Sequence, residues 1–275
     1  MAVRKKNRAE PGVSESIGFI LIFTMVMTGI GLVTLYGYPM LINQQTSANE
    51  RIMEKNMIVL QNDVKSLAYK TVPYKESSLK VEGGSLTVYN TMSTPAVSTI
   101  DIQDCPGAGS NVYLSTFHSG DLRYYSASAD TDISLQNGAV VMRPHSRPGS
   151  SMLAEPRWFY DSATNAIVVN LIGFNSSDIF SLSGTGTVQM AMGNTNYTYI
   201  SPLPGSLCIK YTPTSTQDYS VAWNNYFMKV LNNPPYTSVS PSGSPGTGLP
   251  ITYTVSSTTP MTLVIKKYDV VIKGL

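Results

Sequence analysis

The sequence predicts an α+β protein in which a long N-terminal helix with a transmembrane segment precedes an antiparallel β-sandwich domain. Three observations lead to this fold class. Residues 16–42 contain no charged side chain, residues 43–69 repeat apolar side chains at helical spacing, and the chain beyond residue 80 breaks into short, turn-separated segments. The first two patterns predict helix, and the third predicts many short strands.

The composition of the 275-residue chain limits the kinds of partner that it can bind. Only 13% of the residues are charged, and the formal net charge is +2. Because four basic residues lie within the first eight positions, the rest of the chain has no basic surplus. A nucleic-acid-binding protein needs clustered positive charge, so the sequence argues against nucleic acid as a partner. The basic residues at the N-terminus are Arg4, Lys5, Lys6 and Arg8.

Residues 16–42 form the predicted transmembrane segment. In a helix, 27 residues extend about 40 Å, which is enough to cross a hydrocarbon core about 30 Å thick. The run is longer than the apolar core of a cleaved secretory signal, and no Ala-x-Ala-like site follows it. The basic residues precede the span, so the positive-inside rule predicts a single-pass protein with a cytoplasmic N-terminus and an extracellular C-terminal domain.

The helix is expected to continue beyond the membrane. Apolar residues recur at steps of four, three, four and three, which makes one stripe along a helix. Pro39 is expected to kink this helix without ending it, so that residues 13–69 form one long helical segment. The stripe is expected to lie on the globular domain, and it consists of Met53, Met57, Leu60, Val64 and Leu67.

The stretch "PGVSESIGFILIFTMVMTGIGLV", from residue 11 to residue 33, resembles the N-terminus of archaeal type IV pilins and archaellum-like subunits. The resemblance covers about residues 4–42. It implies a class III signal peptide, residues 1–12, that a prepilin peptidase removes between Gly12 and Val13. It also implies that the retained helix first contacts membrane lipid and later packs against copies of itself or other pilin subunits in a filament core. The helix residues implied in that core are Val26, Met27, Ile30, Leu32 and Leu35.

The resemblance leaves two other interpretations open. Many bacterial pilins carry Glu at the fifth mature position, where this chain has Ile17, and the domain is larger than in many archaeal pilins. The chain could therefore be a minor or tip subunit, or an uncleaved single-pass anchor for an extracellular β-domain with a binding or cell-envelope role. An anchored hydrolase whose site is not readable from the sequence is a further alternative.

Residues 80–275 form the predicted extracellular β-sandwich domain. Gly83 and Gly84 predict a β-hairpin, because a Gly-Gly pair between alternating segments is a strong turn signal. Residues 217–232 favour a short helix, and the Pro-, Gly- and Ser-rich residues 232–250 predict a loop. The other predicted strands are 97–102, 111–117, 139–144, 166–174, 186–192, 197–200, 206–211, 251–255 and 262–273.

Two kinds of modification site occur in this domain. Asn175 and Asn196 each begin an Asn-x-Ser/Thr sequon, which the predicted topology places outside the cell. Cys105 and Cys208 could form one disulfide outside the cell, or remain as two buried thiols.

The sequence contains no motif that predicts catalysis. His118 and His145 lack the spacing of metal ligands, and no Gly-x-Ser-x-Gly, Walker or dinucleotide-binding motif is present. We therefore expect no enzyme activity, no metal and no cofactor, and the function prediction is a structural subunit of a cell-surface filament.

Overall fold

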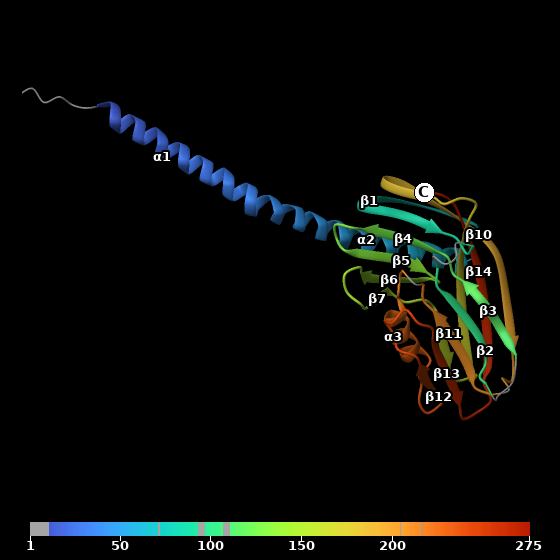
Figure 1. The fold of residues 1–275 in the computed structure, drawn as a ribbon. Coiled ribbons are helices and arrows are strands. Elements are labelled where there is room, and N and C mark those ends of the chain that lie inside the picture. Colours follow the sequence, from blue (N-terminus) through green and yellow to red (C-terminus); the bar gives the residue numbers. More distant parts are fainter. Residues whose placement is uncertain (1–10, 71, 93–96, 107–110, 204, 215) are drawn as a thin grey trace, which may run out of the picture. The chain divides into compact units, whose positions relative to one another are not determined.

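The computed structural model describes residues 11–70, 72–92, 97–106, 111–203, 205–214 and 216–275 (Figure 1). The chain divides into two compact units, the first ending at Ala48 and the second covering Asn49–Leu275. The described part of the first unit, from Pro11 onward, is helical. The second unit contains the C-terminal part of the long helix, two β-sheets and a short helix.

The first unit contains helix α1 (Pro11–Leu32), a π-helical turn η1 (Val33–Gly37) and the beginning of α2 (Tyr38–Lys70). In the π-helical turn, the backbone N–H of Tyr38 donates to the carbonyl oxygen of Val33. Pro39 has no N–H to offer, and helices accommodate such a break with a locally widened turn. The helix thus continues past Pro39, as the sequence predicted.

The predicted apolar stripe of α2 lies in the core of the second unit. Its five residues are at most 1% exposed, so this prediction is confirmed. They pack with apolar residues of the larger sheet, including Leu86, Ile133 and Val188. Gln61 lies on the same face and donates hydrogen bonds to the carbonyl oxygens of Gly138 (2.7 Å) and Glu155 (2.9 Å). These bonds offset the cost of burying a polar side chain.

Within the described residues, the larger sheet has nine strands in the order β7-β6-β5-β4-β1-β10-β14-β9-β8. Five further strands form a second sheet in the order β12-β13-β11-β2-β3. The larger sheet consists of β1 (Tyr74–Tyr89), β4 (Asp121–Ser126), β5 (Thr131–Gln136), β6 (Ala139–Pro144), β7 (Ser151–Ala154), β8 (Phe159–Asp161), β9 (Ala166–Ser176), β10 (Ser181–Ile200) and β14 (Thr262–Gly274). The smaller sheet consists of β2 (Thr99–Asp104), β3 (Val112–His118), β11 (Leu207–Thr212), β12 (Thr237–Ser242) and β13 (Ile251–Ser257).

A second hydrophobic cluster is shared by both sheets and by helix α3 (Ser220–Val230). It joins Ile209 of the smaller sheet and Leu263 of the larger sheet with Trp223 and Phe227 of α3. The α3 helix lies within residues 217–232, where the sequence favoured a helix. The fold class is therefore α+β, with a long apolar helix followed by a domain of two mostly antiparallel sheets.

The predicted hairpin at Gly83 and Gly84 is wrong. β1 is one 16-residue strand, and its register on β10 shifts between Val81 and Leu86. Gly83 has φ +72°, and a Cβ on Gly84 would lie 2.2 Å from the carbonyl oxygen of Tyr125. The glycines therefore permit a bend and a close strand approach, while β1 pairs with β10 along most of its length and with β4 near its end.

Several other strand predictions are corrected by the structure. The segments 186–192 and 197–200 are parts of the single strand β10, and the predicted loop 232–250 contains β12. β9 and β14 pair in parallel, so the predicted antiparallel arrangement holds for most strand pairs but not for this one. The domain's first strand begins at Tyr74, ahead of the predicted start at residue 80. β4, β5, β7 and β8 were not predicted, and β4 and β5 in particular bury polar side chains that hide the strand pattern.

Candidate functional site

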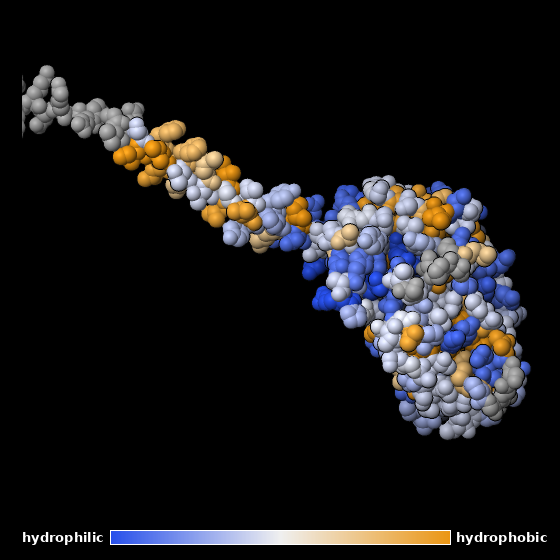
Figure 2. Space-filling view, viewed as in Figure 1, coloured by the Kyte–Doolittle hydropathy of each residue, from blue (hydrophilic) through white to orange (hydrophobic). Residues whose placement is uncertain are grey.

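The apolar helix is the candidate functional segment of this chain. Helices α1 to α2, from Ser16 to Lys70, are long and apolar enough to cross a membrane by length and composition. The large apolar side chains of α1 are exposed, as Phe19 (71%) and Ile30 (56%) illustrate. Figure 2 shows apolar residues along this helix. A water-exposed apolar surface of this extent is unfavourable, so the helix requires lipid or protein around it.

Three threonines of α1 and η1 form hydrogen bonds to their own helix. The hydroxyls of Thr24, Thr28 and Thr34 donate to the carbonyl oxygens four residues earlier, over 2.7, 2.7 and 2.9 Å. Each hydroxyl is thus satisfied without water, and these threonines can lie in hydrocarbon or against another helix.

The structure places the predicted filament-core residues on the exposed surface of the helical unit. Val26, Met27, Ile30, Leu32 and Leu35 are each between 53% and 71% exposed. They are distributed around the helix, because steps of one, three, two and three residues do not follow one face. Neighbouring apolar residues are similarly exposed, so the structure does not single out these five.

The predicted cleavage site lies at the beginning of α1. Gly12 and Val13 belong to the first turn of this helix, which starts at Pro11. Most of the predicted basic leader, residues 1–10, lies outside the described residues.

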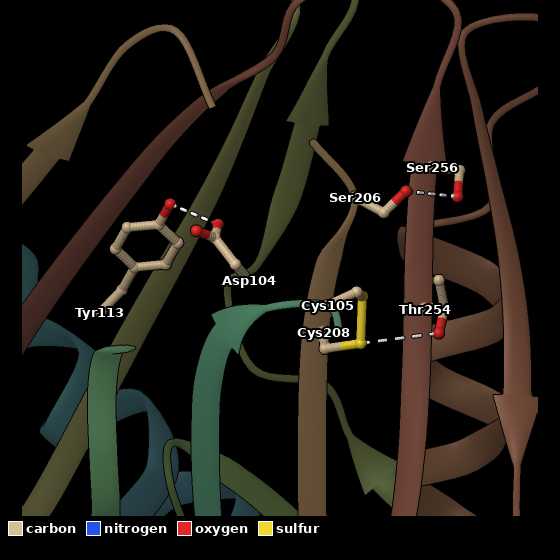
Figure 3. The surroundings of a disulfide bond; sticks show 7 residues. All are labelled: Asp104, Cys105, Tyr113, Ser206, Cys208, Thr254 and Ser256. Carbon is tan, nitrogen blue, oxygen red and sulfur yellow. Dashed lines mark hydrogen bonds between the residues drawn. A yellow bond between two sulfur atoms is a disulfide. The ribbon is translucent and has the colours of Figure 1, made fainter. Parts of the chain in front are cut away.

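Cys105 and Cys208 form a disulfide in the second unit (Figure 3). Cys105 directly follows β2, and Cys208 lies in the neighbouring strand β11, with a Cα–Cα distance of 5.0 Å. The sulfur of Cys208 lies 3.6 Å from the hydroxyl oxygen of Thr254 on β13. Both cysteines are nearly buried, so the crosslink is part of the smaller sheet rather than an exposed redox site.

The two predicted sequons differ in their surroundings. Asn196 lies in an exposed part of β10. Asn175 lies in β9, is half-buried, and its side-chain oxygen accepts a hydrogen bond from the hydroxyl of Thr91. An attached sugar therefore has open space at Asn196, whereas the side chain of Asn175 is half-buried and held by the hydrogen bond from Thr91.

The two histidines belong to different sheets. His145 follows β6, its Nε2 lies 2.9 Å from a carboxylate oxygen of Asp132, and its ring stacks on Tyr125 with centroids 4.8 Å apart. His118 ends β3, and its Nδ1 has no hydrogen-bond partner within the described chain. The structure does not bring the two histidines together. Among the described residues, no group of three or more His, Cys, Asp or Glu side chains could hold a metal ion.

Sequence reasoning missed a buried ion pair in β4. One carboxylate oxygen of Asp121 accepts hydrogen bonds from Nε (3.0 Å) and Nη2 (2.7 Å) of Arg123 and from the hydroxyl of Ser134 (2.8 Å). The guanidinium also lies over the ring of Tyr89, 4.4 Å from its centroid. The Asp-x-Arg spacing was the available signal, because it places both side chains on one face of a strand.

Comparisons with known proteins give the family but not an activity. An uncharacterized protein from Archaeoglobus fulgidus is 22% identical over 130 residues, which are 44% of this chain and 48% of that protein. The chain thus spans about half the length of this relative. No solved structure matches the chain significantly. Residues 12–230 match a family described as being of unknown function, DUF7289. Because this match covers most of the sequence, the chain belongs to the family of unknown function DUF7289.

Proposed function

We propose that this protein is a pilin-like, non-enzymatic subunit of a cell-surface filament, with a β-rich domain that packs as a sandwich. One observation carries the proposal. α1 is apolar and exposed, while α2, which begins within the same apolar segment, ends in the core of the β-rich domain. A helix used only as an anchor needs no such continuation into a core, whereas a filament subunit needs its domain held firmly to the assembling helix.

The surface of α1 suits both a lipid bilayer and, after assembly, the helix-packed core of a filament. Its apolar side chains suit the hydrocarbon of a bilayer, and its threonine hydroxyls are already satisfied. Gly18, Gly29 and Gly31 have open space where a Cβ would lie, so a second helix backbone can approach closely there. In assembly, lipid contacts are exchanged for contacts with copies of this chain or with other pilin subunits.

The charge distribution and the disulfide support the proposed location. The basic residues Arg4 to Arg8 precede the span, which favours a cytoplasmic N-terminus and an extracellular domain. The disulfide between Cys105 and Cys208 supports this orientation, because structural disulfides persist mainly outside the reducing cytoplasm.

The cleavage experiment tests the proposal directly. The full chain is produced in an archaeal host with a prepilin peptidase, and intact-mass spectrometry of the membrane fraction identifies its N-terminus. We expect a mature chain that begins at Val13, and surface filaments that contain it by immunogold electron microscopy. A chain that retains its leader and forms no filament instead identifies an anchored extracellular domain.

A pair of matched variants tests the role of the apolar helix in the same host. Val26→Arg introduces a charge into the span and is expected to cost about 2.5–3.5 kcal/mol of insertion free energy at the membrane centre. It should abolish recovery in filaments. Val59→Arg makes the same change at an exposed position of α2, outside the span, and should leave assembly intact. Equal assembly of both variants would contradict the proposal.

The glycosylation prediction also depends on the proposed extracellular location. We expect a sugar on Asn196 and none on Asn175, because only Asn196 is free of a tertiary side-chain hydrogen bond and exposed. Peptide mass spectrometry of protein from a glycosylating host checks this expectation, with Asn196→Gln as the control that should remove the added mass. Modification at Asn175 alone would contradict it.

A further inference from the structure

A cavity of about 460 Å³ lies beside the last turn of α2, on the larger sheet. Its volume falls within the range of about 300–1,000 Å³ that is typical of small-ligand pockets. Six parts of the second unit line it: α2, the segment before β8, and the strands β8, β9, β10 and β14. The side chains that matter for binding are Tyr69 of α2, Arg157 before β8, and Lys266 and Tyr268 of β14.

The cavity contains two cationic side chains and no carboxylate. Among the described residues, neither Arg157 nor Lys266 forms an ion pair. The guanidinium of Arg157 and the ammonium of Lys266 also donate no hydrogen bond to any described residue. The neighbouring carboxylate of Glu155 instead pairs with Lys229 at 2.6 Å. The carboxylate of Asp269 on β14 pairs with Lys267, with 3.8 Å between Oδ1 and Nζ. The positive charge in the cavity is therefore available to an anion.

The surroundings of Arg157 orient it for such an anion. Its guanidinium carbon lies 5.2 Å from the ring centroid of Tyr69, so an aromatic face supports the planar group. Stacking of this kind leaves the N–H donors at the edge of the guanidinium free. A carboxylate matches this edge in a bidentate geometry, and a stacked Arg loses less freedom when it binds one.

Aromatic rings continue from the cavity along one face of the sheet. Tyr69 and Tyr268 meet edge to face, with centroids 5.4 Å apart. Burial raises the pKa of both phenols, and the proximity of Tyr268 raises that of Tyr69 further, so both remain neutral hydrogen-bonding groups at pH 7. Tyr197 of β10 pairs directly with Lys266, which places it on the face of the cavity, and Tyr199 follows on the same face. These two rings are 75% and 67% exposed.

We propose that this cavity binds an acidic saccharide, with the carboxylate of one sugar held by Arg157 and Lys266. Neighbouring sugars would stack on the exposed rings of Tyr197 and Tyr199, because the apolar faces of sugar rings suit aromatic surfaces. A nucleic acid strand carries one phosphate per nucleotide and needs more cations than the cavity offers. An acidic peptide would use the same cations but not the tyrosine face.

The binding experiment uses the full chain in detergent micelles and isothermal titration calorimetry at low ionic strength. The probe is trigalacturonate, and its fully methyl-esterified form is the matched neutral probe. We expect saturable binding of trigalacturonate alone. Arg157→Gln and Lys266→Gln should each weaken it by about tenfold or more, the effect expected for loss of one charge-assisted contact. Tyr197→Ala should also weaken it, through the loss of stacking.

Control variants and probes make the proposal refutable. Lys210→Gln removes another exposed lysine, on β11 of the smaller sheet, and should leave binding unchanged. Arg157 and Lys266 are exposed, so their variants should keep the thermal unfolding midpoint of the parent. The proposal is overturned if trigalacturonate does not bind, or if its neutral ester binds equally well. It is also overturned if Lys210→Gln weakens binding as much as Arg157→Gln does, or if a penta-glutamate peptide binds more tightly than trigalacturonate. None of these outcomes depends on filament assembly.

Discussion

Replacing Cys105 and Cys208 together by alanine is expected to lower the free energy of unfolding by about 4–5 kcal/mol. The disulfide closes a loop with a sequence separation of 103 residues, and a crosslink of this length removes much of the entropy of the unfolded chain. Chemical unfolding of the full chain in detergent micelles, followed by the fluorescence of the buried Trp158 and Trp223, measures the change.

Thr254→Ala is the matched control for the crosslink. It removes the hydroxyl next to the sulfur of Cys208 but leaves the disulfide closed, so we expect a loss of about 1 kcal/mol or less. Reduction of the parent protein should reproduce the destabilisation of the double variant. If the free energy of unfolding of the double variant lies within about 1 kcal/mol of the parent value, the disulfide does not provide this stability.

Arg123→Met is expected to destabilise the domain by about 3–5 kcal/mol at neutral pH. It leaves the Asp121 carboxylate buried without its cation, and an uncompensated buried charge is costly. Burial already raises the pKa of Asp121, and Arg123 is the largest influence in the opposite direction. In the variant, this pKa should rise further, so protonation relieves the cost. The destabilisation should therefore be larger at neutral than at acid pH. It should shrink as the pH falls through the raised Asp121 pKa of the variant toward that of the parent, because below both values Asp121 is neutral in each native protein.

Two variants separate the buried charge from other consequences of losing Arg123. Lys80→Met breaks the exposed pair between Lys80 and Glu82 and should cost about 1 kcal/mol or less at any pH. Adding Asp121→Leu to Arg123→Met removes the remaining charge and should recover much of the stability. Denaturant unfolding at several pH values measures all three proteins. A cost for Arg123→Met that is independent of pH would contradict the buried-charge explanation.

The resemblance to archaeal pilins and the transmembrane prediction both depend on local sequence. The apolar residues 16–42 and the stripe at Met53, Met57 and Leu60 can be read within a few helical turns. The structure has the helices there and buries the stripe. Helix α3 was predictable for the same reason, since its apolar residues repeat over one short segment.

Predictions of strand pairing were less successful, because they depend on residues that are far apart in the chain. Gly83 and Gly84 form a local turn signal, yet β1 continues because β10 and β4 supply its neighbours from far along the chain. The parallel pairing of β9 with β14 could not be predicted either, because the two strands are separated by β10 to β13. β4 was missed since Asp121 and Arg123 are polar, and only the fold shows that they neutralise one another inside the core.

The sequence by itself determined the helical segments, the length and polarity of the apolar span, and the residues that α2 buries, because these depend on side chains a few positions apart. Only the tertiary structure decided which strands pair, that Cys105 meets Cys208, and that Arg157 and Lys266 share one cavity. Those contacts join residues that are far apart in the chain, and no local period encodes them. Their formation depends on how the whole domain buries its apolar surface.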